Sequence, residues 1–150
     1  MKNQESVSEY MSTKLITFTP DVEIKEAIKI LLTNKISGAP VIDNTGKLVG
    51  MLSEKDCIRL LVDGPYNQIP SGDGQVKDYM SKRIKTLSHS SSIMDAAYEF
   101  VNCSYRRFPV LEGKKLVGQI SRRDVLRAID QRRPNVDHVP STWKGRVPAT

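Results

Sequence analysis

Apolar residues recur along the chain with two alternating periods, and the same order of periods occurs twice. A helical face is predicted in each half by apolar positions at i, i+3, i+4 and i+7, which are Ile24, Ala27, Ile28 and Leu31 and then Ile93, Ala96, Ala97 and Phe100. Two short apolar runs around a turn follow each helix, at 39–43 and 47–52 and then at 108–112 and 116–120. A last helix is predicted over 54–62 and over 122–131, and an extended run at 15–18 precedes the first helix.

The residues themselves repeat as well as their polarity. Val7-Ser-Glu-Tyr-Met-Ser12 returns as Val76-Lys-Asp-Tyr-Met-Ser81, and the segment 40–59 returns as 109–127. A repeat of this length is one supersecondary unit used twice. We therefore predict a first repeat at 7–63, a linker at 64–75, a second repeat at 76–131 and a basic, proline-containing tail at 132–150, whose role the sequence leaves open.

Each repeat is predicted to be a β-α-β-β-α unit, which makes the fold class α+β. Neither unit has enough strands to close a core alone, so the two should pack sheet to sheet with pseudo-twofold symmetry. Facing repeats leave clefts between them, and these clefts are where we expect the function.

Composition narrows the class of protein. The chain has 150 residues, 39% of them hydrophobic and 27% charged, which is typical of a soluble globular protein. It contains no apolar run long enough to span a bilayer and no secretory signal, so we expect a cytoplasmic protein without a membrane partner. Cys57 and Cys103 are interpreted as free thiols.

The charge is uneven between the two repeats. Residues 7–63 carry seven basic and eight acidic side chains, whereas residues 76–131 carry eleven and six. An anionic partner would explain the excess in the second repeat, and a solvated basic face is the alternative.

A Ser-x-x-Asp sequence stands at the start of the last helix of each repeat, as Ser53-Glu-Lys-Asp56 and Ser121-Arg-Arg-Asp124. A capping box explains either copy alone. Together, however, the helix amides and a fixed carboxylate could hold a polar ligand, the amides facing a phosphate and the carboxylate binding a ribose diol.

Each repeat contains, in order, apolar residues, Pro-Val, Leu-Val-Gly and Ser-x-x-Asp. This pattern, present twice over residues 7–131, resembles the tandem CBS (cystathionine β-synthase) domains that pair into a Bateman module. The resemblance is to the adenine-nucleotide sensor type of the AMP-activated kinase γ subunit. It implies a non-catalytic regulatory module that binds AMP, ADP or ATP, or S-adenosylmethionine, as a regulatory ligand rather than a cofactor. It also implies a homodimer that signals to an unknown effector protein in trans.

The resemblance assigns site residues to two clefts. In the first cleft, Asp56 and Ser53 match the ribose-binding junction, Arg106, Arg107 and Arg123 match phosphate ligands, and the adenine would lie near Ile36, Ala39 and Pro40. In a second, weaker cleft, Asp124 and Ser121 face Ser37 and Gly38, and Lys55 is the basic residue at the corresponding junction.

Other functions remain open at this point. The basic second repeat and tail could bind nucleic acid, although the sequence shows neither a helix-turn-helix nor an aromatic RNA platform. A module that binds nothing and only dimerises is a further alternative. No nucleophile and base pair and no metal-ligand spacing is present, so no enzyme and no metal site are predicted.

Overall fold

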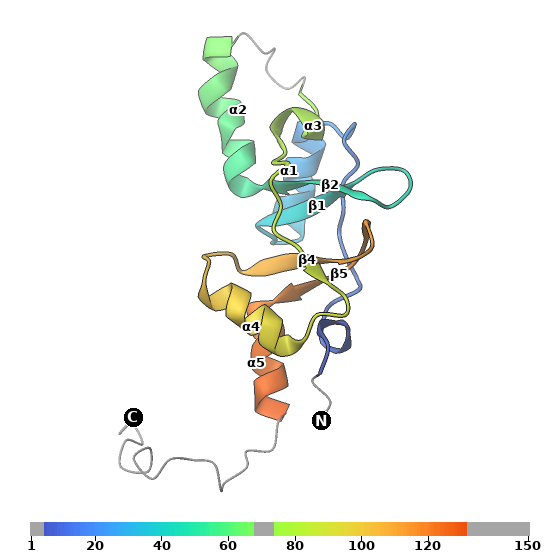
Figure 1. Cartoon of the computed structure of the whole chain (residues 1–150). Coiled ribbons are helices and arrows are strands. Elements are labelled where there is room, and N and C mark those ends of the chain that lie inside the picture. The colour runs from blue at the N-terminus through green and yellow to red at the C-terminus, as the bar shows by residue number, and fades with distance from the viewer. Residues whose placement is uncertain (1–4, 68–73, 132–150) are drawn as a thin grey trace, which may run out of the picture.

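The computed structural model describes residues 5–67 and 74–131 and shows an α+β protein (Figure 1), as predicted. The predicted tail at 132–150 and positions 68–73 of the predicted linker lie outside the described residues. In chain order the elements are η1 (Val7–Glu9), α1 (Ile24–Thr33), β1 (Gly38–Ile42), β2 (Leu48–Ser53), α2 (Glu54–Asn67), α3 (Val76–Tyr79), β3 (Leu87–Ser88), α4 (Ile93–Val101), β4 (Arg107–Glu112), β5 (Lys115–Ser121) and α5 (Arg122–Gln131).

The strands form two small sheets. β1 and β2 make an antiparallel hairpin, and β4 and β5 make a second hairpin to which β3 adds in parallel. The sheets lie next to each other in the middle of the molecule, with α1 and α2 on the outer side of one and α4 and α5 on the outer side of the other (Figure 1). This arrangement is the predicted sheet-to-sheet packing, in which neither hairpin forms a core alone.

Two elements differ from their predicted extent. The extended run at 15–18 forms only a single bridge, between Phe18 and Val41, because Pro20 has no N–H with which to continue the ladder. α2, predicted over 54–62, continues to Asn67, past Gly64 and Pro65 and into the predicted linker.

The repeats exchange their first segments. Val7 of the first repeat is fully buried in the core of the second, with Phe108, Val110 and Ile120. Val76 and Tyr79 of the second repeat are in turn buried in the core of the first. The packing units therefore each combine residues from both repeats, and neither repeat has a complete core without the other.

The exchange explains why Gly50 and Gly118 occur at equivalent strand positions. A Cβ atom at Gly50 would lie 2.5 Å from Met80 Sδ, and one at Gly118 would lie 2.5 Å from Met11 Sδ. Next to these contacts, Ser12 and Gln119 exchange both backbone hydrogen bonds at 2.8 and 3.0 Å, as do Met51 and Ser81 at 2.9 and 2.8 Å. The repeated glycine thus accommodates the repeated methionine of the other repeat.

Candidate functional site

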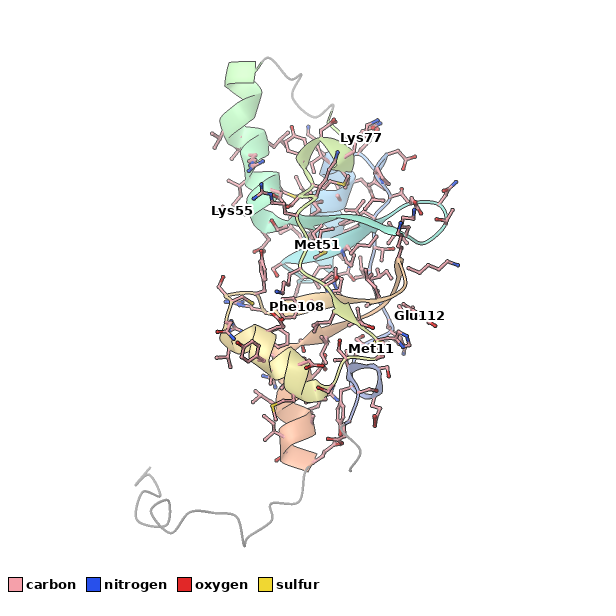
Figure 2. All side chains as sticks on the ribbon, in the orientation of Figure 1. Met11, Met51, Lys55, Lys77, Phe108 and Glu112 are labelled. Carbon is pink, nitrogen blue, oxygen red and sulfur yellow. The ribbon has the colours of Figure 1, made fainter. Side chains whose placement is uncertain are left out.

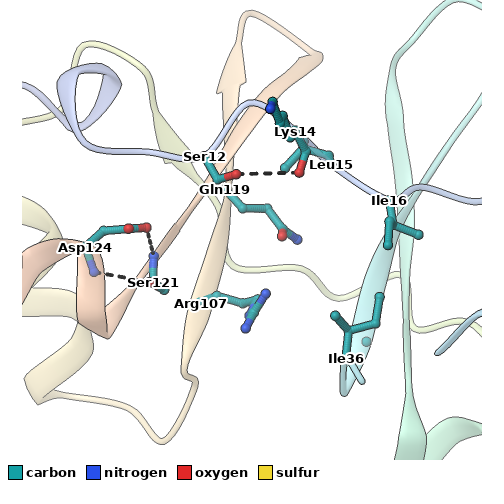
Figure 3. Close-up of a pocket in the computed structure, with 10 residues that line it drawn as sticks. Ser12, Lys14, Leu15, Ile16, Ile36, Arg107, Gln119, Ser121 and Asp124 are labelled. Carbon is teal, nitrogen blue, oxygen red and sulfur yellow. Dashed lines mark hydrogen bonds between the residues drawn. The ribbon is translucent and has the colours of Figure 1, made fainter. Parts of the chain in front are cut away.

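Two pockets lie between the repeats. The larger, of about 860 Å³, is lined by 37–38, 51–56 and 59 of the first repeat and by 81, 83–85 and 104–109 of the second. The smaller, of about 200 Å³, is lined by 12, 14–16, 36 and 38 of the first repeat and by 107, 119, 121 and 124 of the second (Figure 3). Each pocket thus combines the strand-to-helix junction of one repeat with the first segment and the helix-to-strand turn of the other.

The junction in the larger pocket is held by a capping box. Asp56 Oδ2 accepts hydrogen bonds from the backbone N–H and the hydroxyl of Ser53, both at 2.9 Å, and Asp56 N donates to Ser53 Oγ at 3.1 Å. No donor contacts Asp56 Oδ1 within the described parts of the chain. The carboxylate is therefore fixed in position and keeps one oxygen for a ligand hydroxyl.

The equivalent junction in the smaller pocket differs at this oxygen. Ser121 N donates to Asp124 Oδ2 at 2.8 Å, and Asp124 N donates to Ser121 Oγ at 3.2 Å. Asp124 Oδ1, however, accepts from Nη2 of Arg127, which also donates to the carbonyl of Tyr10 at 3.2 Å. Asp124 is thus less available to a ligand than Asp56, because Arg127 binds its second oxygen.

The larger pocket is strongly basic. Its lining includes two acidic side chains, Glu54 and Asp56, and six basic ones, which are Lys55, Arg59, Arg83, Lys85, Arg106 and Arg107. Of these six, Lys85 is bound to Glu99 at 2.9 Å, and this hydrogen bond raises the pKa of Lys85. The other five form no ion pair with the side chains that the structure describes, those of residues 5–62 and 74–131. An anion of more than one charge would be favoured here.

Three residues that line the larger pocket are labelled in Figure 2. Met51 comes from β2 and Phe108 from β4, and Lys55 stands in the first turn of α2. Tyr105 precedes β4, is half exposed and makes an edge contact with Phe108, with ring centroids 6.0 Å apart. The half-exposed Tyr105 ring gives this pocket an apolar face on which a base could stack, and the buried Phe108 ring supports it from the side.

The structure separates the residues predicted for the first cleft. It brings Asp56, Ser53, Arg106 and Arg107 together in the larger pocket. Ile36 lines the smaller pocket instead, while Ala39 and Pro40 are buried and line neither of the two pockets. Arg123 is exposed and also lines neither of the two pockets.

Ile36 reaches the smaller pocket through the way that α1 ends. Lys35 takes a left-handed φ of 54°, its N–H donates to the carbonyl of Leu32, and Ile36 N donates to that of Leu31. These are the two bonds of a Schellman motif, which reverses the chain and packs Ile36 against the core of its own repeat.

The residues predicted for the second cleft are also divided. Asp124 and Ser121 line the smaller pocket, and Gly38 lines both pockets. Ser37 and Lys55 line the larger one. Lys55 immediately precedes Asp56 and shares its helical turn, so it lies on the same side of the repeats as that carboxylate.

Sequence reasoning missed the contribution of the extended segments at 14–16 and 83–85. Lys14 and Leu15 line the smaller pocket, and Arg83 and Ile84 line the larger. The repeat itself could have revealed these segments. The offset of 69 residues that relates Gly38 to Arg107 also relates Lys14 to Arg83 and Leu15 to Ile84, and it relates Ile36 to Tyr105.

Burial, together with the carboxylates of Asp56 and Glu54, raises the pKa of the Cys57 thiol to about 11, so this thiol is protonated at neutral pH. Within the described ranges, no group of three or more His, Cys, Asp or Glu side chains could hold a metal ion. None of the helices described is both long and apolar enough to cross a bilayer.

Comparison with known proteins gives a family match over both repeats. The family model of the CBS domain matches residues 7–63 and 76–131. The chain is 29% identical to protein MJ1225 of Methanocaldococcus jannaschii, over 83% of this chain and 43% of that protein. It is 31% identical to the chloroplastic CBS domain-containing protein CBSX1 of Arabidopsis thaliana, over 82% of this chain and 63% of the relative. It therefore spans less than two thirds of each of these relatives.

Solved structures agree with this match. The crystal structure of CBSX2 in complex with AMP has a TM-score of 0.74 to this chain at 30% identity, covering 85% of this chain and 97% of that one. CBSX2 is a CBS-pair protein of Arabidopsis thaliana. The crystal structure of MJ1225 has the same TM-score at 21% identity, over 86% of this chain and 49% of that one, which is a likeness of fold.

Proposed function

This chain belongs to the CBS domain family, and we propose that it is a regulatory module that binds an adenosine phosphate, AMP, ADP or ATP, in the larger pocket between its repeats. One observation carries the proposal. The larger pocket places a fixed carboxylate with a free oxygen, Asp56 Oδ1, in the same cavity as the basic pair Arg106 and Arg107. A carboxylate suits the ribose diol, and guanidinium groups suit phosphate oxygens.

The relative CBSX2 supports this choice of ligand, since its crystal structure is a complex with AMP. The volume of about 860 Å³ falls within the usual range for pockets that enclose small ligands. The basic lining favours a phosphorylated adenosine over adenosine itself, and the half-exposed Tyr105 offers a surface for the base.

The proposal is tested by calorimetric titration and thermal unfolding with AMP, ADP, ATP, adenosine and S-adenosylmethionine. We expect an adenine nucleotide to bind, and at 100 times its dissociation constant to stabilise the protein by about 2.7 kcal/mol. Tighter binding of S-adenosylmethionine than of every nucleotide would show that S-adenosylmethionine, and not an adenosine phosphate, is the ligand. If none of the five compounds binds, the alternative of a module that binds no ligand and only dimerises would be favoured. Tight, salt-dependent binding of a mixed oligonucleotide would favour the nucleic-acid alternative.

We further propose that the module acts as a homodimer on a partner protein. Helices α2 and α5 leave apolar side chains exposed on their outer faces, with Ile58 60%, Leu61 79% and Val62 58% exposed on α2, and Leu126 60% and Ile129 54% exposed on α5. Equivalent faces on the two repeats suit a twofold partner copy.

The dimer is tested by light scattering at micromolar concentration. The wild type should have twice the mass of one chain, and Leu61→Glu combined with Leu126→Glu should give monomers, because buried unpaired carboxylates would oppose pairing. Glu112→Lys, an exposed change on β4 outside both helices, is the control and should remain dimeric. A monomeric wild type would contradict the proposal.

A further inference from the structure

Arg107 occupies a central position that the two pockets share. It is the first residue of β4 and pairs with Ser121 on β5, while Gly38 is the first residue of β1 and pairs with Ser53 on β2. These equivalent positions, 38 and 107, both line both pockets. Figure 3 shows the Arg107 side chain reaching into the space of the smaller pocket.

Only one of these central positions carries a charge. A Cβ atom at Gly38 would lie 2.8 Å from the carbonyl oxygen of Leu52 and 3.3 Å from Ser53 Cα, so the backbone leaves no room for a side chain there. Arg107 is exposed, and within the described residues it forms no ion pair that would hold it in place. The guanidinium can therefore move toward either pocket.

The pockets depend on this guanidinium to very different degrees. Without Arg107, the larger pocket keeps Lys55, Arg59, Arg83, Lys85 and Arg106. The smaller pocket would keep a single basic side chain, Lys14, which shares its lining with the Asp124 carboxylate. Loss of Arg107 would therefore weaken anion binding mainly in the smaller pocket.

The smaller pocket has an independent sign of a ligand in Gln119. This side chain is only 9% exposed, and its Nε2 has no hydrogen-bond partner within the parts of the chain that the structure describes. Figure 3 shows its amide in the space between Arg107 and Ile16. A buried donor without a partner is costly, so an acceptor group of a ligand in this pocket would stabilise it.

We propose that Arg107 couples the two pockets negatively, because its guanidinium can bind a ligand phosphate in only one of them at a time. The inference rests on the proposed nucleotide binding. An anionic ligand in the larger pocket withdraws Arg107 and weakens an anionic ligand in the smaller pocket, and by linkage the reverse holds equally. Adenosine carries no phosphate, so it leaves Arg107 free and shows no coupling.

The coupling is measured by calorimetric titration of AMP and of adenosine into the wild type and Asp56→Ala, in which the larger pocket is disabled and Arg107 is retained. AMP should bind the smaller pocket of Asp56→Ala at least about fivefold more tightly than the second AMP binds the wild type. For adenosine the two affinities should agree. In Arg107→Gln, the affinity of the smaller pocket for AMP should no longer depend on whether the larger pocket is filled.

Arg106→Gln is the matched control, since Arg106 is also exposed but lines the larger pocket alone. It should weaken the first AMP and keep the coupling. It also replaces Asp56→Ala as the disabled variant if the loss of the cap unfolds that protein. If the coupling is strong, the wild type binds only one AMP, and Asp56→Ala binds AMP in the smaller pocket.

Three outcomes would overturn the coupling. Equal affinities of the smaller pocket in the wild type and Asp56→Ala would overturn it while leaving the proposed function intact. One AMP in the wild type and none in Asp56→Ala would show that the smaller pocket takes no AMP. No AMP in the wild type would overturn the proposed function as well.

Discussion

Asp56→Ala should remove most of the stabilisation that AMP gives to the protein. Asp56 Oδ1 is the free carboxylate oxygen of the larger pocket, and hydrogen bonds to a charged group each contribute about 1.5–3 kcal/mol. The affinity for AMP should fall roughly tenfold to 100-fold, measured by calorimetry and by the shift of the unfolding midpoint with AMP.

Asp124→Ala is the matched control for this change. Asp56 and Asp124 occupy the same position in equivalent capping boxes, so each variant should lose about 1 kcal/mol of stability from the cap without ligand, and Asp124→Ala loses the bond to Arg127 as well. Only Asp56→Ala should also lose the first AMP. An Asp56→Ala protein that binds AMP as tightly as the wild type would show that the nucleotide does not use this carboxylate.

Arg106→Ala should weaken AMP far more than adenosine. The charge-assisted bonds that it removes go to the phosphate, which adenosine lacks, so we expect a loss of roughly tenfold to 100-fold for AMP and of about twofold or less for adenosine. Parallel calorimetric titrations with the two ligands measure the difference.

Arg123→Ala is the control here, because Arg123 is an equally exposed arginine that lines neither of the two pockets. It should leave both affinities unchanged. Equal losses of AMP and adenosine in Arg106→Ala would remove Arg106 from the phosphate site. A loss in Arg123→Ala as large as that in Arg106→Ala would point instead to a diffuse electrostatic effect of the basic second repeat.

The sequence predicted the strand-to-helix junctions more accurately than the residues that line the pockets around them. Ser53 and Asp56 are separated by three residues at a helix start, and a local spacing of this kind determines a capping box whatever the rest of the chain does. Ile36 and Lys55, by contrast, lie in pockets other than those predicted. The local turn at the end of α1 sets the direction of Ile36, but which pocket each of the two residues lines depends on how the two repeats pack against each other.

The amino-acid sequence by itself determined the elements, their order, the twofold repeat and the pairing of hairpins, because these follow from short-range periodicity and from the repeated residues. Tertiary structure alone decided the exchange of Val7 and Val76 between the cores, the capture of Asp124 by Arg127 and the position of Arg107 between the two pockets. Each of these depends on contacts between residues far apart in the chain, and such contacts exist only once the two repeats have packed together.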